Sequence, residues 1–98
     1  MDRKKAISEL KSRELRLREL GVLSLYLFGS TARGDALPGS DVDLFIDHEE
    51  TDMFSLFDLL EIKYFLEDSI HAPIDIMTRR SIHPVLKESI LAEAERVF

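Results

Sequence analysis

Two short apolar segments joined by a polar turn constrain this chain more than any other feature. The first, Val22–Phe28, runs directly into Gly29 and Ser30, and the second, residues 41–47, opens with two aspartates one residue apart. The first segment is too short and too uniformly apolar for a surface helix, and such runs are typical of buried strands. The pattern therefore predicts two core strands connected by a turn segment. Residues that favour turns lie between them, namely Gly34, Pro38 and Gly39.

The rest of the chain alternates helical patterns with one further apolar run. Apolar residues at helical spacing predict a helix over residues 3–20 and another from Pro84 to Val97. Asp52 is placed to cap a third helix that extends through Leu66, and residues 74–77 predict a third strand. This order indicates a single α/β domain over residues 1–98, with helices packed on a sheet of three or more strands. The third helix carries an apolar face formed by Met53, Leu56, Phe57, Leu60 and Tyr64.

Composition excludes several classes of protein. The chain has 98 residues, a formal net charge of −6 and no cysteine. This acidic balance argues against a general nucleic-acid-binding surface, because such surfaces need clustered Lys and Arg. No apolar run approaches the roughly 18 residues that span a bilayer, and no signal segment follows the charged N-terminus. We therefore expect a cytoplasmic protein that has no disulfide bond and does not act at a membrane.

The paired aspartates predict a metal site. Side chains at i and i+2 of a strand project from one face, so Asp41 and Asp43 should lie side by side. Two carboxylates that close repel each other unless a cation lies between them or one is protonated. Oxygen ligands without cysteine or paired histidine favour Mg²⁺ or Mn²⁺ over zinc.

A third acid extends this prediction. Asp75 stands between Ile74 and Ile76 in the expected interior of the sheet, where a carboxylate needs a partner. A neighbouring metal site would provide that partner. Three converging carboxylates could hold two ions, the arrangement that serves in-line displacement at phosphorus.

The turn after the first strand predicts a phosphate site. Gly29 lets the backbone approach a ligand closely, and the residues that follow it open a short helix whose free N–H groups attract phosphate. Ser30 can add a hydroxyl, and Arg33, one helical turn on, could reach either the phosphates or an acidic neighbour. The segment is not a Walker A loop, because Asp35 and Ala36 stand where Lys and Ser/Thr are required.

Two arginines follow the third predicted strand. Arg79 and Arg80 are expected to face solvent, and a phosphate or partner contact is the alternative.

Together these residues resemble a known family. Gly29-Ser30-x-x-Arg33-Gly34, followed by Ser40-Asp41-x-Asp43-Leu44 and by Asp75 on a later strand, resembles the nucleotidyltransferase superfamily that includes DNA polymerase β-type and kanamycin nucleotidyltransferases. The small size resembles the minimal MNT-type proteins, which are often encoded beside a HEPN-domain ribonuclease and act as its antitoxin. The resemblance implies a small nucleotidyltransferase fold with a mixed sheet.

The resemblance also implies roles for individual residues. Asp41, Asp43 and Asp75 would bind two Mg²⁺ ions and carry the catalysis, with Asp75 also helping to activate the acceptor hydroxyl. Gly29 and Ser30 would hold the triphosphate of ATP, while Arg33 matches a motif position beside them. The implied reaction transfers AMP from ATP to a hydroxyl, and the implied acceptor is a tyrosine of a partner HEPN toxin.

Two alternatives stay open. The chain could neutralise a HEPN partner by binding alone, with the metal site vestigial or structural. It could also modify a small molecule as the aminoglycoside enzymes do, although 98 residues leave little wall for such a pocket. We expect an oligomer or a hetero-complex, because helix faces over residues 53–66 and 86–97 offer more apolar surface than one thin sheet must cover.

Overall fold

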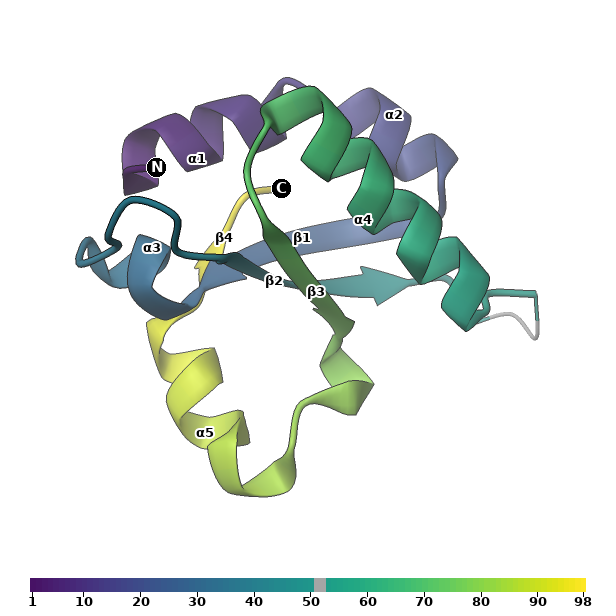
Figure 1. The fold of residues 1–98 in the computed structure, drawn as a ribbon. Helices are drawn as coiled ribbons and strands as arrows, with labels where there is room; N and C mark the ends of the chain where they lie inside the picture. The colour runs from purple at the N-terminus through teal and green to yellow at the C-terminus, as the bar shows by residue number, and fades with distance from the viewer. Residues whose placement is uncertain (51–52) are drawn as a thin grey trace.

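A computed structural model describes residues 1–50 and 53–98 as helices packed on a twisted sheet. Helices α1, α2 and α4 cover one face of the sheet, α3 lies at one end of it, and α5 lies on the opposite side (Figure 1). Within the described ranges, no helix has the length and apolar character needed to cross a membrane. The elements are α1 (Arg3–Lys11), α2 (Glu14–Glu19), β1 (Val22–Phe28), α3 (Gly29–Arg33), β2 (Val42–His48), α4 (Leu56–Ile70), β3 (Ile74–Thr78), the 3-10 helix η1 (Arg79–Ser81), α5 (Pro84–Glu93) and β4 (Glu95–Arg96).

The sheet is mixed, and over the described residues its strand order is β3-β2-β1-β4. Strand β1 pairs antiparallel with β2 and with β4, whereas β2 pairs parallel with β3. Helix α4 connects β2 to β3 and supplies the long crossover that a parallel pair requires. The predicted α/β class, a mixed sheet flanked by helices, is therefore confirmed. The register sets Phe28 opposite Asp43 and Asp43 opposite Asp75, which brings three strands together at one point.

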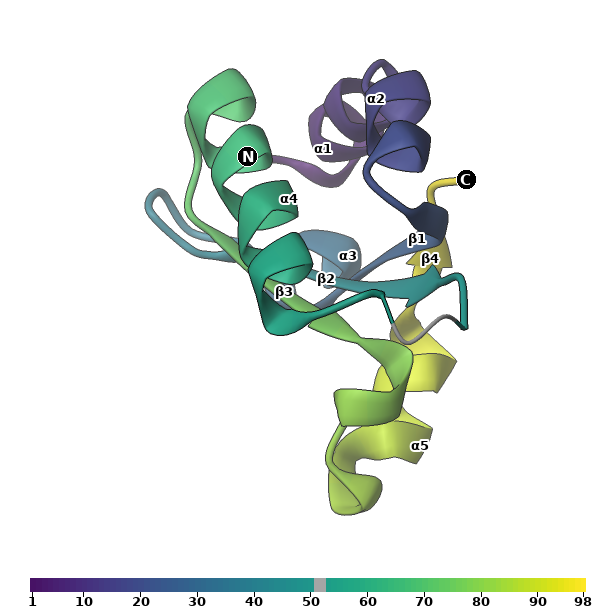
Figure 2. The same cartoon turned by 90° about the vertical axis from the view of Figure 1, so that its right-hand side faces the viewer.

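The main core lies between the sheet and the layer formed by α1, α2 and α4 (Figure 2). Val42, Leu44 and Ile46 of β2 are buried in it, because alternate residues of a strand point to the same face. They share one apolar cluster with the fully buried Leu17 of α2 and Leu66 of α4. The opposite face of β2 is thereby left to the odd-numbered residues of the strand, including Asp43.

The predicted helix over residues 3–20 is wrong in one respect, because it is broken between Lys11 and Glu14. The Ser12 hydroxyl and the Arg13 guanidinium both donate to the Glu9 carbonyl, at 2.7 Å each. Arg13 also reaches α4, where it donates to the Ser69 carbonyl at 2.8 Å and to the Ser69 hydroxyl at 2.9 Å. The break therefore lets one arginine satisfy a carbonyl group near the end of α4.

The third helix begins later than predicted and packs on a different face. The predicted cap, Asp52, lies outside the described residues, and α4 instead begins after Ser55, which forms a capping box with Asp58. The buried residues of this helix are Ile62 and Leu66. Several members of the predicted apolar face point to solvent instead: Met53, Leu56, Phe57 and Tyr64.

The last predicted helix ends early, and the residues after it form a strand. Helix α5 stops at Glu93 because Ala94 is extended, with φ −66° and ψ 140°. Strand β4 then pairs with β1, and the Val97 N–H donates to the Leu25 carbonyl at 2.8 Å. The prediction missed this strand because two residues are too few to show an alternating pattern. Val97 is buried in the core, while no residue of α5 itself is buried.

The first prediction concerns the arginine that joins α1, α2 and α4. Arg13→Lys should lower the free energy of unfolding by about 1–2 kcal/mol, because one ammonium cannot bond Glu9 and Ser69 at the same time in this geometry. Urea denaturation followed by circular dichroism measures the change. Arg16→Lys is the control, since the ion pair of Arg16 with Glu19 is exposed on both sides and should change stability by less than about 0.5 kcal/mol. Equal losses in the two variants would contradict the bridging role.

Candidate active site

Asp43 lies at the centre of the candidate site. It is half-buried on β2, directly opposite Phe28 of β1 and Asp75 of β3. Asp41 is exposed and stands just before β2 begins, and its charge still acts on Asp43. The register therefore brings Asp43 and Asp75 together, with Asp41 near the start of the same strand.

Asp75 does not lie in the interior of the sheet as the sequence suggested. Strand β3 is at the edge of the sheet over the described residues, and the Asp75 side chain is exposed. An exposed carboxylate needs no buried partner, so the burial argument for a metal at Asp75 is wrong. Its place opposite Asp43 is independent of that argument. An edge position also leaves Asp75 accessible to a second reactant.

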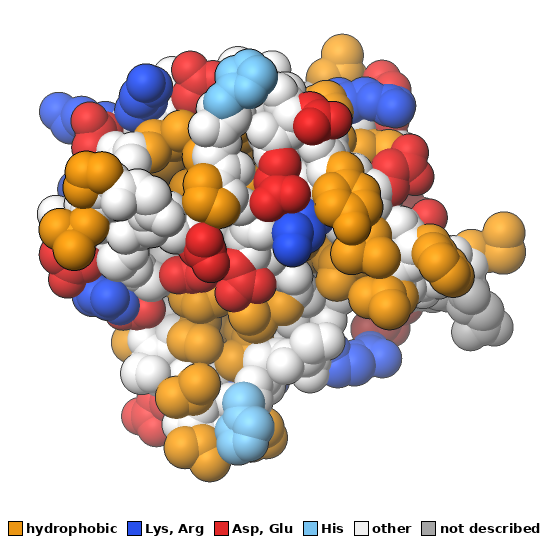
Figure 3. Space-filling model, viewed as in Figure 1, with side chains coloured by type: hydrophobic (Ala, Val, Ile, Leu, Met, Phe, Trp, Pro, Cys, Tyr) orange, Lys and Arg blue, Asp and Glu red, His pale blue; other side chains and the backbone are white. Residues whose placement is uncertain are grey.

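Negative charge is concentrated around Asp43. The pKa of Asp43 is raised to about 6, first by burial and then by the charges of Asp75 and Asp41, while Arg33 opposes the shift. A carboxylate in such surroundings is stabilised by a proton or by a cation. Figure 3 shows acidic side chains gathered near the middle of one face of the molecule.

The donor set suits a hard divalent cation, because the neighbouring ligands are carboxylate oxygens that repel one another. Within residues 1–50 and 53–98, however, no three acidic or histidine side chains lie close enough to form a metal-binding group. The sheet pairs Asp43 with Asp75, whereas Asp41 precedes β2 and is exposed. Convergence of Asp41, Asp43 and Asp75 on Mg²⁺ therefore stays a prediction.

Gly29 faces the Asp43 carboxylate at the end of β1. Its φ of +73° lies in the left-handed region, which favours glycine. A Cβ at this position would overlap the Oδ2 atom of Asp43. The sequence indicated a close approach of the Gly29 backbone to a ligand, and the structure shows that the group approached is the Asp43 carboxylate. Glycine is thus required by both backbone conformation and space.

Helix α3 begins at Gly29, and two of its donors, the buried Gly29 N–H and the exposed Arg33 guanidinium, bind a residue that the sequence reasoning missed. The Gly29 N–H donates to the Glu93 Oε1 atom at 3.1 Å. The Arg33 guanidinium contacts both oxygens of the same carboxylate, at 3.1 and 3.3 Å. Glu93 ends α5, more than sixty residues away in the chain, and no local pattern distinguishes it from other helical glutamates. Ser30 follows Gly29 on α3 and is half-buried.

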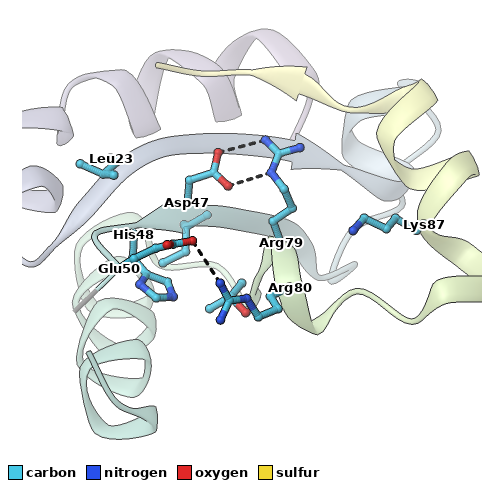
Figure 4. Close-up of a pocket in the computed structure, with 9 residues that line it drawn as sticks. Leu23, Asp47, His48, Glu50, Arg79, Arg80 and Lys87 are labelled. Atoms are coloured by element: carbon cyan, nitrogen blue, oxygen red, sulfur yellow. Dashed lines mark hydrogen bonds and ion pairs between the residues drawn. The ribbon is translucent and has the colours of Figure 1, made fainter. Parts of the chain in front are cut away.

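A separate cavity of about 430 Å³ lies toward the far end of β2 (Figure 4). Arg79 lines it and binds Asp47 through two hydrogen bonds, at 2.7 and 3.0 Å, which hold the pKa of Asp47 below its ordinary value. The guanidinium also lies 4.9 Å from the ring centre of Tyr26. Arg79 is therefore partly buried rather than solvent-facing, whereas Arg80 is exposed and pairs with Glu50. The cavity is distinct from the Asp43 cluster.

The fold is that of a class of domain that transfers a nucleotidyl group. The chain matches the nucleotidyltransferase domain family over residues 3–97 and belongs to it. A protein of Methanocaldococcus jannaschii, provisionally named a protein adenylyltransferase, is 39% identical over 93 residues, covering 94% of this chain and 98% of that protein. The protein adenylyltransferase MntA of Thermococcus cleftensis is 35% identical over 81 residues, covering 83% of this chain and 79% of that protein. The predicted family membership and the predicted enzyme class are confirmed.

Solved structures share the fold. One provisionally named a minimal nucleotidyltransferase has a TM-score of 0.82 and 32% identity, covering 97% of this chain and 95% of that one. A toxin–antitoxin structure with AMP-PNP has a TM-score of 0.74 and 21% identity, covering 90% and 72% of the two chains. A complex of a tri-AMPylated HEPN toxin with an MNT antitoxin, from Shewanella oneidensis, has a TM-score of 0.66 and 19% identity, covering 90% and 68%. At these lower identities the last two establish likeness of fold alone.

The second prediction tests why glycine is needed at position 29. Gly29→Ala should destabilise the domain by at least about 3 kcal/mol, because strain at positive φ adds to overlap with Asp43. Gly34→Ala is the matched control: its φ is +82°, and a Cβ there would meet nothing within 4 Å. That variant should lose only about 1 kcal/mol. Thermal and urea denaturation measure both, and equal losses would mean that the Asp43 contact imposes no constraint.

The third prediction follows from the raised pKa of Asp43. The folded state holds this proton more tightly than the unfolded chain, so Asp43 lowers stability as pH rises from about 4 to about 6. With chelator present to remove metal, Asp43→Asn should therefore stabilise the domain by about 1–2 kcal/mol at pH 7.5 after allowance for solvent screening. The gain should shrink to a small fraction near pH 3.5, where the folded state is protonated and the unfolded state mostly so. A gain that is the same at both pH values in urea titrations would contradict the electrostatic cause.

Proposed function

We propose that this chain is a Mg²⁺-dependent adenylyltransferase that transfers AMP from ATP to a tyrosine hydroxyl of a HEPN-domain toxin, and that it acts as the antitoxin. The observation that carries the proposal is the strand register that sets Asp43 against both Gly29 and Asp75. It places acids suited to a divalent cation next to a turn suited to phosphate. The names of the related proteins support the choice of AMP, and the Shewanella complex supports the choice of partner.

Each group at the site has a chemical task in this reaction. The Gly29 N–H, the Ser30 hydroxyl and Arg33 would hold the phosphates of ATP. Asp41, Asp43 and Asp75 would hold Mg²⁺, which when bound neutralises charge on the phosphates and lowers the pKa of a nearby hydroxyl. These residues have the donor chemistry that such a complex needs.

The transfer step uses the exposed position of Asp75. The acceptor oxygen attacks the α-phosphorus, its proton passes to the Asp75 carboxylate, and the bond to the leaving pyrophosphate breaks. Asp75 lies on the edge strand, where a protein acceptor can approach, whereas Asp43 is half-buried against Gly29. This division assigns the acceptor side to Asp75 and the nucleotide side to Asp43.

The surface offers room for a protein partner. The outward face of α4 exposes Leu56, Phe57 and Tyr64, and apolar side chains gather over this helix in Figure 3. Val85 and Leu86 of α5 are also more than half exposed, at 79% and 53%. Exposed apolar residues grouped in this way mark surfaces that other proteins cover. We therefore propose a hetero-complex or an oligomer as the working state.

The fourth prediction tests the acceptor role. Asp75→Asn should lower the rate of AMP transfer to a cognate HEPN protein by about 100-fold or more, while its affinity for Mg²⁺-ATP falls only a few-fold. Ser30→Ala should show the reverse in milder form, with weaker ATP binding and a smaller effect on the chemical step. Intact-mass spectrometry of the HEPN protein reports each added AMP, and calorimetry reports ATP affinity.

The control for this experiment is Asp68→Asn, which removes an exposed aspartate of α4 and should leave transfer unchanged. One outcome would contradict the catalytic proposal. If the wild-type chain neutralises the HEPN protein without adding mass, and Asp75→Asn neutralises it equally well, the chain acts by binding alone.

A further inference from the structure

Glu93 occupies the donors to which the triphosphate is assigned. One carboxylate oxygen accepts from the Gly29 N–H at 3.1 Å, and both oxygens lie 3.1–3.3 Å from the Arg33 Nη1 atom. A carboxylate bound by a backbone N–H and a guanidinium makes the same contacts that a phosphate oxygen would make there. The Gly29 N–H has one proton to donate, so a carboxylate and a phosphate cannot both occupy it fully.

Charge makes the two occupants incompatible as well. Asp43 already lies against Gly29, and Glu93 places a further negative charge beside the same turn. A triphosphate entering this position would meet repulsion from Glu93 in addition to that from the aspartates. A bound cation can offset the negative charge of the aspartates. Glu93, in contrast, occupies the Gly29 N–H and Arg33, the donors proposed for the phosphates.

The contact is built so that it can open. The Glu93 side chain is 27% exposed and the Arg33 side chain 48%, so water can reach their ion pair, whereas Gly29 itself is buried. Helix α5 has no buried residue, and its apolar contact with the sheet runs through Ile90, with Ala94 just beyond the helix end. Rotation of one side chain, or a small shift at the end of α5, would free the donors.

We propose that Glu93 is a built-in competitor of the nucleotide: it holds the Gly29 N–H and Arg33 in the nucleotide-free domain and is displaced when the phosphates bind. This inference rests on the proposed function, because it takes Gly29 and Arg33 as the phosphate donors. Displacement would also release the link between α3 and α5, so nucleotide binding is coupled to the attachment of α5.

The fifth prediction measures this competition as affinity for Mg²⁺-ATP by calorimetry. Glu93→Gln keeps the size of the side chain and removes its charge, and it should bind ATP about 5- to 20-fold more tightly than the wild type. Glu88→Gln is the matched control, because Glu88 is an exposed glutamate on the same helix and its loss should leave affinity unchanged. The direction of the change in ATP affinity is decisive, because a purely structural role for Glu93 would give weaker ATP binding when the charge is removed.

A second readout on the wild-type chain does not depend on how a variant folds. In nuclear magnetic resonance titrations with ATP and Mg²⁺, the Gly29 amide and the backbone amides at the end of α5 should shift together.

Each other outcome overturns the inference. Equal or weaker ATP binding by Glu93→Gln, with tight binding by the wild type, would overturn it and leave the proposed transferase intact. Movement of the Gly29 resonance without α5 would do the same. If neither the wild type nor Glu93→Gln binds ATP, the competition and the assignment of the phosphate site both fall.

Discussion

The close approach of the Gly29 backbone to the Asp43 carboxylate is the constraint that sets the geometry of the candidate site. It exists because β1 and β2 pair in a register that sets the end of one strand against the start of the other. A one-residue slip would turn Asp43 toward the core and Val42 or Leu44 toward the site. The apolar residues of β2 therefore hold the register, and the register in turn places the acid. Core packing and site geometry are two results of one alternating pattern.

The same placement creates an electrostatic problem that the surrounding residues only partly relieve. Asp43 is half-buried and faces Asp75 across the strand pair, and its raised pKa reflects both facts. Arg33 acts in the stabilising direction, but in the structure its guanidinium is engaged by Glu93 and Asp35. A site with unrelieved negative charge and occupied cationic donors is suited to a ligand that brings a cation and an anion together. A nucleotide carrying a divalent metal has that composition.

The two faces of the sheet are covered to different degrees. On one face, α1, α2 and α4 bury a continuous core and are tied together by Arg13. On the other, α5 has no buried residue and covers a smaller cluster around Phe45. The continuous core fixes the register that places the acids, whereas the helix without buried residues carries Glu93 to the Gly29 N–H and Arg33, the donors that we propose for phosphate. The acids and Glu93 are thus held by layers that differ in burial.

The local elements that carry the chemistry could be predicted from the amino-acid sequence. Short apolar runs placed β1, β2 and β3 to within a residue or two, and the Gly-Ser turn with its paired aspartates indicated the family. These signals are readable because they arise from neighbouring residues, through side-chain alternation and the conformational freedom of glycine. The same reasoning failed where the outcome depended on distant contacts. Arg13, at the break between α1 and α2, binds the distant Ser69 of α4, and the short strand β4 pairs with β1.

Which groups meet at the site depended instead on how the elements pack in three dimensions. Packing set Asp75 on an exposed edge rather than in the interior, and it turned Leu56, Phe57 and Tyr64 of α4 toward solvent. It also brought Glu93 to the Gly29 backbone from the far end of the chain. No local pattern encodes such contacts, because they depend on how whole elements pack against one another. The residue types of the candidate site could be identified from the amino-acid sequence, whereas their partners and their exposure were decided by the tertiary structure.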